Sequence, residues 1–242
     1  MLQNKSWHRT IALFVINLFI VACLYLPFTP KGYTQNTAPA QSCAQDDIAC
    51  LFAQLELQTA QIKNTSWKDK TYRELVKLLA ADKRTDKALK ILDKIEHPDT
   101  KALTIRGIGM AAAESDFTPE ELSTLFTTLR QRAENISHPP SHTIALTYIA
   151  MAQALAGDDD GATATAAAMQ NDDLRNKAYA EAAEIQAEQQ RLQAALVSIS
   201  HIDDLAFRDK AYLNITKIFT KQNKYDDALN ASEKISTAYQ KS

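Results

Sequence analysis

Residues 224–235 read KYDDALNASEKI and carry the pattern that decides the fold. The segment opens with polar residues, continues through alanine and leucine at helical spacing, and ends on Ile235. A shorter version, RTDKAL, stands at residues 84–89. Apolar residues at intervals of three and four favour an amphipathic helix, and the recurrence of one helix far upstream favours an internal repeat.

The repeat can be followed through the chain by one apolar position. Its members lie 33 residues apart, with a single interval of 41: Ile62, Ile95, Ile136, Met169, Ile202 and Ile235. Tyrosines keep a second register at Tyr72, Tyr179 and Tyr212. Each unit has two apolar-periodic segments with a polar turn between them, which predicts a helical hairpin.

The long unit holds eight extra residues after Ala111. Within them, Thr118, Pro119 and Glu121 predict a helix start, because they supply a cap, a first-turn proline and a capping-box acid. We expect the extra residues to lengthen the turn of this hairpin, or its second helix as well.

Composition agrees with an all-α fold. The 242 residues include only 5 glycines, too few for a glycine-rich phosphate loop or a many-turned β-fold. Prolines beyond residue 40 fall only at expected turns or first helical positions, where proline is tolerated. No single hairpin can bury its apolar face, so neighbouring hairpins must stack.

Residues 224–235 resemble the second helix of a tetratricopeptide repeat. The three tyrosines open first helices, and small residues fill the close-packing position at Gly109, Ala150 and Ala183. The period of 33 departs from the usual 34, and Val76 and Thr216 replace the small residue in two units.

This resemblance implies a right-handed superhelix over residues 43–242, with a leading helix at 44–62 and five helical hairpins. It also implies a non-enzymatic binding scaffold, with no catalytic residue and no cofactor, whose partner is set by surface residues.

The N-terminus has the pattern of an export signal. Lys5 and Arg9 precede the apolar run at residues 11–28, IALFVINLFIVACLYLPF. We expect residues 1–28 to stay as an inner-membrane anchor that places the rest in the periplasm or outside. Two alternatives are a bacterial lipoprotein with Cys23 lipidated, and cleavage near the small residues at 38–40 followed by secretion.

Residues 29–42 predict a flexible linker, and Cys43 and Cys50 follow it in an oxidising compartment. Seven residues on one helix rise about 10.5 Å, beyond the reach of a disulfide. A Cys43–Cys50 bond therefore requires Cys43 on a lead-in, with Asp46 or Asp47 near the helix start. The alternative is two unpaired thiols.

The formal charge of −2 combines +3 in residues 1–40 with −5 in the rest. Such a chain is not an electrostatic nucleic-acid binder. One register of the first helices is nevertheless basic, and we expect it to line a groove for an acidic segment or a C-terminal carboxylate. Its members are Lys70, Arg73, Lys77, Arg106, Lys177, Lys210 and Lys217. The alternative is that these are ordinary solvated helix charges.

The histidines of the repeat turns are predicted to have structural roles. His97 and His138 stand at equivalent turn positions with Asn171 and Asp204, which predicts helix caps. His138 and His142 enclose two prolines and lack a third ligand, so we expect no metal site.

The sequence therefore predicts a membrane-tethered scaffold of the cell envelope that binds a protein or peptide. A glycan- or lipid-binding accessory domain, with an apolar groove near Met110 and Met151, is the alternative.

Overall fold

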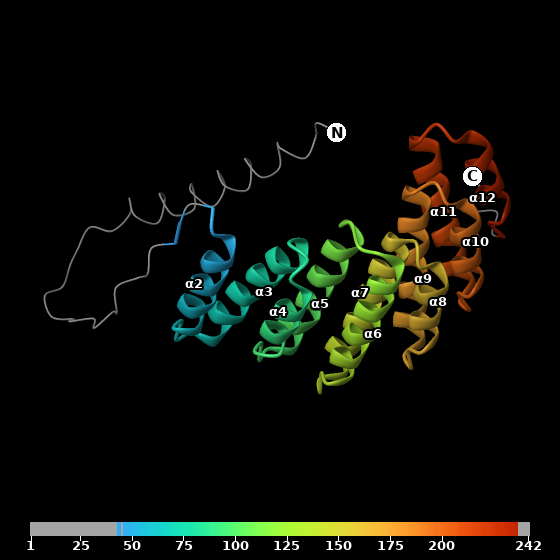
Figure 1. The fold of residues 1–242 in the computed structure, drawn as a ribbon. Helices are drawn as coiled ribbons and strands as arrows, with labels where there is room; N and C mark the ends of the chain where they lie inside the picture. The colour runs from blue at the N-terminus through green and yellow to red at the C-terminus, as the bar shows by residue number, and fades with distance from the viewer. Residues whose placement is uncertain (1–42, 45, 237–242) are drawn as a thin grey trace, which may run out of the picture. The chain divides into compact units, whose positions relative to one another are not determined.

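The computed structural model describes residues 43–44 and 46–236 (Figure 1). Contacts divide the chain after Ser42, and residues 43–242 form one unit. The predicted anchor, the linker and Cys23 lie outside the described residues. Within the described part, no helix combines the length and apolarity needed to cross a membrane.

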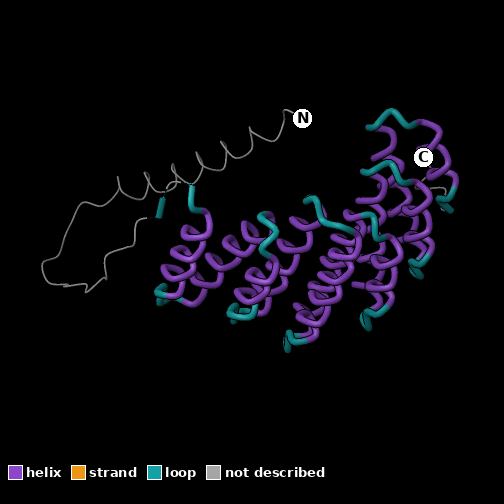
Figure 2. Tube along the Cα trace, in the orientation of Figure 1, coloured by secondary structure: helices purple, strands orange, loops and turns teal. Residues whose placement is uncertain are grey.

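The described part of the chain contains eleven helices and no strand (Figure 2). Helix α2 (Ile48–Ala60) comes first, and the next ten helices form five hairpins, in four of which the first helix is the longer one. The hairpins are α3 (Thr65–Ala81) with α4 (Thr85–Leu92), α5 (Pro98–Ala113) with α6 (Pro119–Glu134), α7 (Pro139–Ala156) with α8 (Asp159–Ala167), α9 (Asp172–Glu188) with α10 (Leu192–Ser200), and α11 (Leu205–Lys221) with α12 (Tyr225–Glu233).

Neighbouring hairpins pack through their first helices, in the order α3, α5, α7, α9 and α11. Each second helix packs against the first helix of its own hairpin. The main buried apolar cluster extends from Phe52 to Ile235, so the hairpins share one core. This arrangement is compatible with a helical repeat fold.

Every first helix begins at a polar cap. The caps are Asn64, His97, His138, Asn171 and Asp204. The side-chain oxygens of Asn64, Asn171 and Asp204 each accept a hydrogen bond from the backbone N–H of the residue three positions later. The N···O distances are 3.0, 2.9 and 2.6 Å, respectively. The cap positions predicted for His97 and His138 are confirmed. At both histidine positions the first helical residue is a proline, and the histidine side chain makes no cap hydrogen bond.

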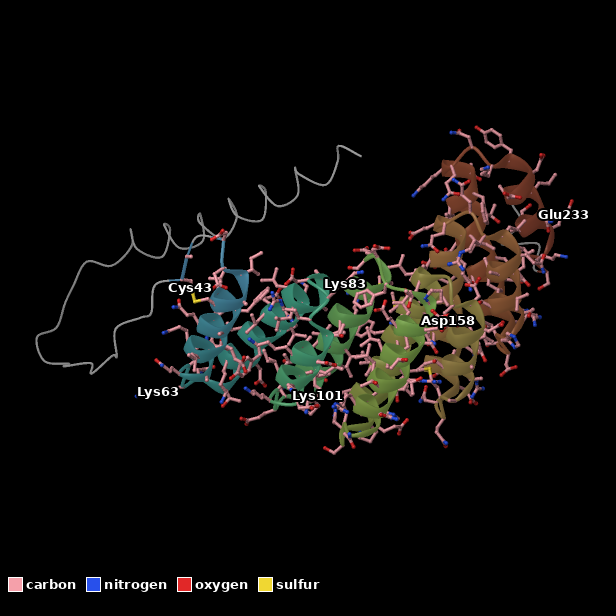
Figure 3. All side chains as sticks on the ribbon, viewed as in Figure 1. Cys43, Lys63, Lys83, Lys101, Asp158 and Glu233 are labelled. Carbon is pink, nitrogen blue, oxygen red and sulfur yellow. A yellow bond between two sulfur atoms is a disulfide. The ribbon has the colours of Figure 1, made fainter. Side chains whose placement is uncertain are left out.

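Four of the five hairpin turns use a residue in the left-handed conformation. These are Lys83, Gly157, Gln190 and Asn223, with φ of 58°, 84°, 61° and 59°. In each turn the next residue donates its N–H to a carbonyl five positions back, at 2.8 or 2.9 Å, which closes a Schellman motif. Lys83 and Asp158, the latter directly after Gly157, are labelled in Figure 3. Only one of the four positions carries the glycine that this conformation favours.

Gln190→Gly should raise the free energy of unfolding by about 0.5–1 kcal/mol, because glycine removes the cost of a Cβ at positive φ. Gln190 is exposed, and its neighbours provide the turn hydrogen bonds. Urea unfolding of the full chain measures the change. Gln190→Ala keeps the Cβ and should give no gain, so equal stabilities of the two variants would contradict this expectation.

The fifth turn contains the extra residues. Thr118 Oγ1 accepts the Glu121 N–H at 3.2 Å, and Glu121 Oε2 accepts the Thr118 N–H at 2.7 Å. With Pro119 in the first turn, this capping box confirms the predicted helix start. Helix α6 has 16 residues, whereas the other second helices have eight or nine, so the insertion lengthens the second helix as well as the turn.

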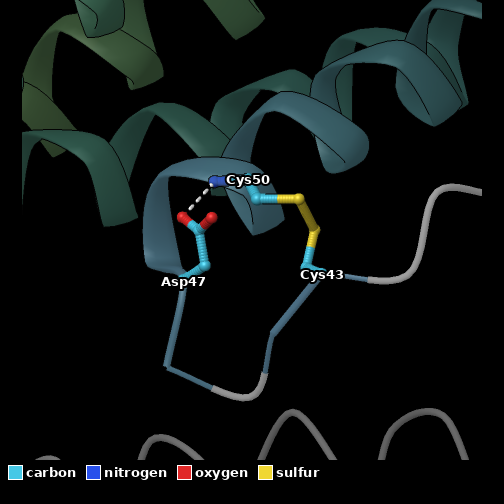
Figure 4. Close-up of a disulfide and its surroundings, with 3 residues drawn as sticks. All are labelled: Cys43, Asp47 and Cys50. Atoms are coloured by element: carbon cyan, nitrogen blue, oxygen red, sulfur yellow. Dashed lines mark hydrogen bonds between the residues drawn. A yellow bond between two sulfur atoms is a disulfide. The ribbon is translucent and has the colours of Figure 1, made fainter.

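Cys43 and Cys50 form a disulfide, with their Cα atoms 5.7 Å apart (Figure 4). Helix α2 begins at Ile48, after Asp47 caps it by accepting the Cys50 N–H at 2.9 Å. Cys43 therefore lies on a lead-in before the helix. The expected leading helix at 44–62 was too long at both ends, because Asp47 caps its start and residues 61–64 turn toward α3.

Candidate partner-binding surface

The predicted basic residues all lie on first helices. Helix α3 carries Lys70, Arg73 and Lys77, α5 carries Arg106, α9 carries Lys177, and α11 carries Lys210 and Lys217. On α7, Ile144 and Met151 stand at places equivalent to Lys70 and Lys77, and Tyr148 lies one residue after the place equivalent to Arg73 and Arg106. We call these ten residues, together with Glu181 and Glu184 of α9, the first-helix face.

One carboxylate engages two of the three cations on the α3 part of this face. Glu74 accepts a hydrogen bond from Arg73 Nε at 2.9 Å and one from Lys77 Nζ at 3.0 Å. Burial by itself would raise the pKa of Glu74, but the hydrogen bonds from Lys77 and Arg73 outweigh it and hold the pKa below its ordinary value. The Lys77 stem also covers Gly107 of α5, where a Cβ would stand 2.6 Å from Lys77 Cγ. Arg73 and Lys77 are therefore engaged within the protein.

Side-chain interactions continue from α5 to α11. The Arg106 guanidinium lies 5.2 Å from the centroid of the Tyr148 ring on α7. Glu184 of α9 accepts a hydrogen bond from Asn214 Nδ2 of α11 at 2.7 Å. Together with the Lys77 stem, which covers Gly107, these contacts connect α3 with α5, α5 with α7, and α9 with α11. They leave only the step from α7 to α9 without such a contact.

Glu181 adds negative charge to this face. Burial, followed by repulsion from Glu184, raises the pKa of Glu181, while Lys177 and Arg106 act in the opposite direction. The predicted basic stripe is thus interrupted by apolar residues on α7 and by two acids on α9.

Three cations of the face remain available. No ion pair joins Lys177, Lys210 or Lys217 to another described residue. All three are exposed, and Lys177 and Lys210 hold equivalent positions on the packed helices α9 and α11. Lys70 lies 5.5 Å from the Trp67 ring centroid of its own helix. The face can therefore present ammonium groups from two neighbouring helices to an anionic group.

Glu181→Gln should stabilise the fold at neutral pH by at most about 0.5 kcal/mol, since solvent screens a half-buried charge. The folded state holds the Glu181 proton to higher pH than the unfolded state does. The penalty is therefore absent below the ordinary pKa of 4.5, grows as the pH rises to the raised pKa, and stays constant above it.

Urea unfolding at pH 4 and pH 7 measures this difference. The gain should be present at pH 7 and should vanish on acidification. Glu188→Gln, on an exposed residue of the same helix, is the control and should change little. A gain of equal size at both pH values would contradict the assignment.

The histidines do not converge on a ligand. His138 Nδ1 lies 2.6 Å from Ser141 Oγ, which in turn donates to Asp99 of α5. The buried hydroxyl stands between imidazole and carboxylate, unlike a catalytic triad, where the imidazole is central. His142 Nε2 instead faces Glu134 Oε1 at 3.5 Å. In the described ranges, no group of three His, Cys, Asp or Glu side chains is arranged to hold a metal ion.

Two acids of the run at 158–160 make structural contacts. Asp158 caps α8 by accepting the Gly161 N–H at 3.0 Å and also accepts from Gln153 Nε2 at 2.8 Å. Asp159 binds Arg191 and accepts from Gln186 Nε2. The Asp159 contacts connect neighbouring hairpins, whereas the Asp158 contacts lie within one hairpin.

No family model, curated protein or solved structure matches the chain. The tetratricopeptide resemblance therefore stays an inference from the repeat, and the surface has to be interpreted from its own residues.

Proposed function

We propose that this protein is a non-enzymatic protein–protein interaction scaffold of the cell envelope. Its hairpins form a tetratricopeptide-like, right-handed superhelix with a 33-residue period, held at the membrane by the N-terminal segment and facing outside the cytoplasm. Support for the period comes from the recurring caps and from the left-handed residues Gly157, Gln190 and Asn223, which follow one another at intervals of 33.

The observation that carries the proposal is the pair Lys177 and Lys210. Both ammonium groups are exposed, stand on adjacent first helices and lack an ion-pair partner among the described residues. Two such donors suit a carboxylate, and charged hydrogen bonds are stronger than neutral ones. Ile144 and Tyr148 on the neighbouring helix α7 offer apolar surface to the side chains next to it.

The acids of α9 limit the chemistry of the partner. Glu181 and Glu184 lie one and two turns beyond Lys177 on the same helix, so a run of acidic side chains would meet like charges there. A single carboxylate avoids this repulsion. We therefore favour a peptide C-terminus over an acidic segment as the group that Lys177 and Lys210 bind.

Crosslinking in the envelope tests the proposal. The full chain should yield a specific crosslinked protein, and the double variant Lys177→Glu/Lys210→Glu should lose it. The matched control is Lys90→Glu/Lys234→Glu, which reverses two exposed charges on the second-helix side and should keep it. No specific product, or an equal yield from both double variants, would contradict the proposal.

The lipid or glycan alternative needs open apolar surface among the alanines. Ala150, Ala152 and Ala154 of α7 are fully buried instead. No observation of the described residues favours that function over peptide binding.

A further inference from the structure

Helices α4 and α6 enclose a groove with a volume of about 410 Å³. One wall comes from the turn between α3 and α4 and from helix α4, and the other comes from Phe117 and helix α6. The second wall starts in the eight-residue insertion, which no other hairpin has. We call this cavity the α4–α6 groove.

The rim of the α4–α6 groove is fixed by contacts between the two hairpins. Lys83 Nζ lies 5.1 Å from the centroid of the Phe117 ring and donates a hydrogen bond to the Asp116 carbonyl. The capping box of Thr118 and Glu121 sets the direction in which α6 leaves the rim. Lys83 and Glu121 are therefore engaged by the rim itself.

The groove offers apolar contact. Leu89 and Phe117 line it while half-buried, and Leu125 lines it while 6% exposed. Covering this surface with one large aliphatic side chain would remove apolar area from water, which is favourable.

The free charge at the groove is negative. Asp86 and Glu120 line it, both are exposed, and no ion pair joins either one to another described residue. The second wall, residues 111–128, contains four acids and no base, whereas residues 82–90 around the first wall contain two acids and four bases. The acids that line the groove, Asp86 and Glu120, therefore favour an occupant that brings positive charge together with an apolar group over an anionic membrane surface.

We propose that the α4–α6 groove binds a basic segment of a protein partner. One large aliphatic side chain of the segment packs on Leu89 and Phe117, and lysine or arginine side chains pair with Asp86 and Glu120. This site lies on the second helices and is separate from the carboxylate site on the first-helix face, so the scaffold holds two regions of opposite charge preference.

Fluorescence anisotropy on the full chain in detergent tests the site. The probe is a fluorescein-labelled nine-residue peptide with a central leucine flanked by lysines. Asp86→Asn/Glu120→Gln should weaken binding about tenfold, because two charge contacts are lost. The control Asp226→Asn/Glu233→Gln neutralises two exposed acids of α12, one of them at the position equivalent to Asp86, and should bind like the parent.

Three results would overturn the site: equal binding by the two double variants, no saturable binding of the peptide, or equal binding of a peptide with serine for leucine. Sedimentation distinguishes a second copy of this chain as the occupant. A dimer that Asp86→Asn/Glu120→Gln abolishes would overturn the peptide assignment. Lys177→Glu/Lys210→Glu should bind the probe like the parent, so the two sites can fail independently.

Discussion

Gly109→Val should lower the free energy of unfolding by about 3 kcal/mol, one of the largest effects expected of a single substitution. Gly109 is buried where α5 packs on α7, and a Cβ there would stand 2.8 Å from the Cβ of Ala152. Leu129 and Phe126 of α6 close the remaining space at 3.7 and 3.8 Å. Valine would force the helices apart or its neighbours out of their rotamers, and such overpacking is costly.

Urea unfolding of the full chain, followed by circular dichroism, measures this loss. Gly107→Val is the matched control, because position 107 meets only the exposed Lys77 stem, which can swing away. Ala152→Gly combined with Gly109→Ala should recover stability relative to Gly109→Ala alone. Equal losses for Gly107→Val and Gly109→Val would contradict the close approach of α5 and α7.

Asp69→Ala should cost about 2–3 kcal/mol. Asp69 is fully buried on α3, and its Oδ2 accepts the N–H groups of Glu96 and His97 at 3.1 and 2.8 Å. These donors belong to the loop that leads into the next hairpin. Alanine would leave both without their acceptor, and unsatisfied donors in a part-buried site are expensive.

Equivalent positions hold the same kind of link. Asn176 accepts the Asp203 N–H at 3.3 Å, and Asp209 accepts the Ser236 N–H at 3.0 Å. Asp69→Asn keeps one acceptor oxygen and should therefore cost clearly less than Asp69→Ala. Thermal unfolding of both variants checks this order, and equal losses would show that the hydrogen bonds to the loop contribute little.

Local signals were sufficient to predict much of the fold. Apolar spacing indicated the helices, and the pattern of Thr118, Pro119 and Glu121 marked the start of α6, because a capping box is formed by residues adjacent in sequence. The cap positions of His97 and His138 were predictable for the same reason.

Contacts between helices escaped prediction. Gln153 accepts from Thr165 at 2.6 Å and Gln186 from Ser198 at 2.9 Å, both buried between the two helices of a hairpin. Leu79 and Phe219 occupy the corresponding place in other hairpins and are fully buried. From sequence alone, a polar side chain between two helices is predicted to lie on the surface, because its hydrogen-bond partner is not known. The same holds for Asp69, which is buried and accepts hydrogen bonds from the next loop.

The candidate surface was predictable only in part. The sequence places the basic residues on one helix register, but the charge of a surface depends on what neighbouring helices add. Tyr148 under Arg106 and the acids at Glu181 and Glu184 change a basic stripe into a mixed face. The α4–α6 groove was missed, although the eight extra residues were its available signal.

Recognition of a carboxylate by Lys177 and Lys210 can be measured directly by calorimetry. The ligand is the C-terminal decapeptide of the crosslinked partner, titrated into the full chain as the free acid and as the C-terminal amide. The free acid should bind at least about tenfold more tightly, and Lys177→Glu/Lys210→Glu should abolish that difference. Equal affinities of acid and amide for the parent protein would contradict carboxylate recognition by this pair of lysines.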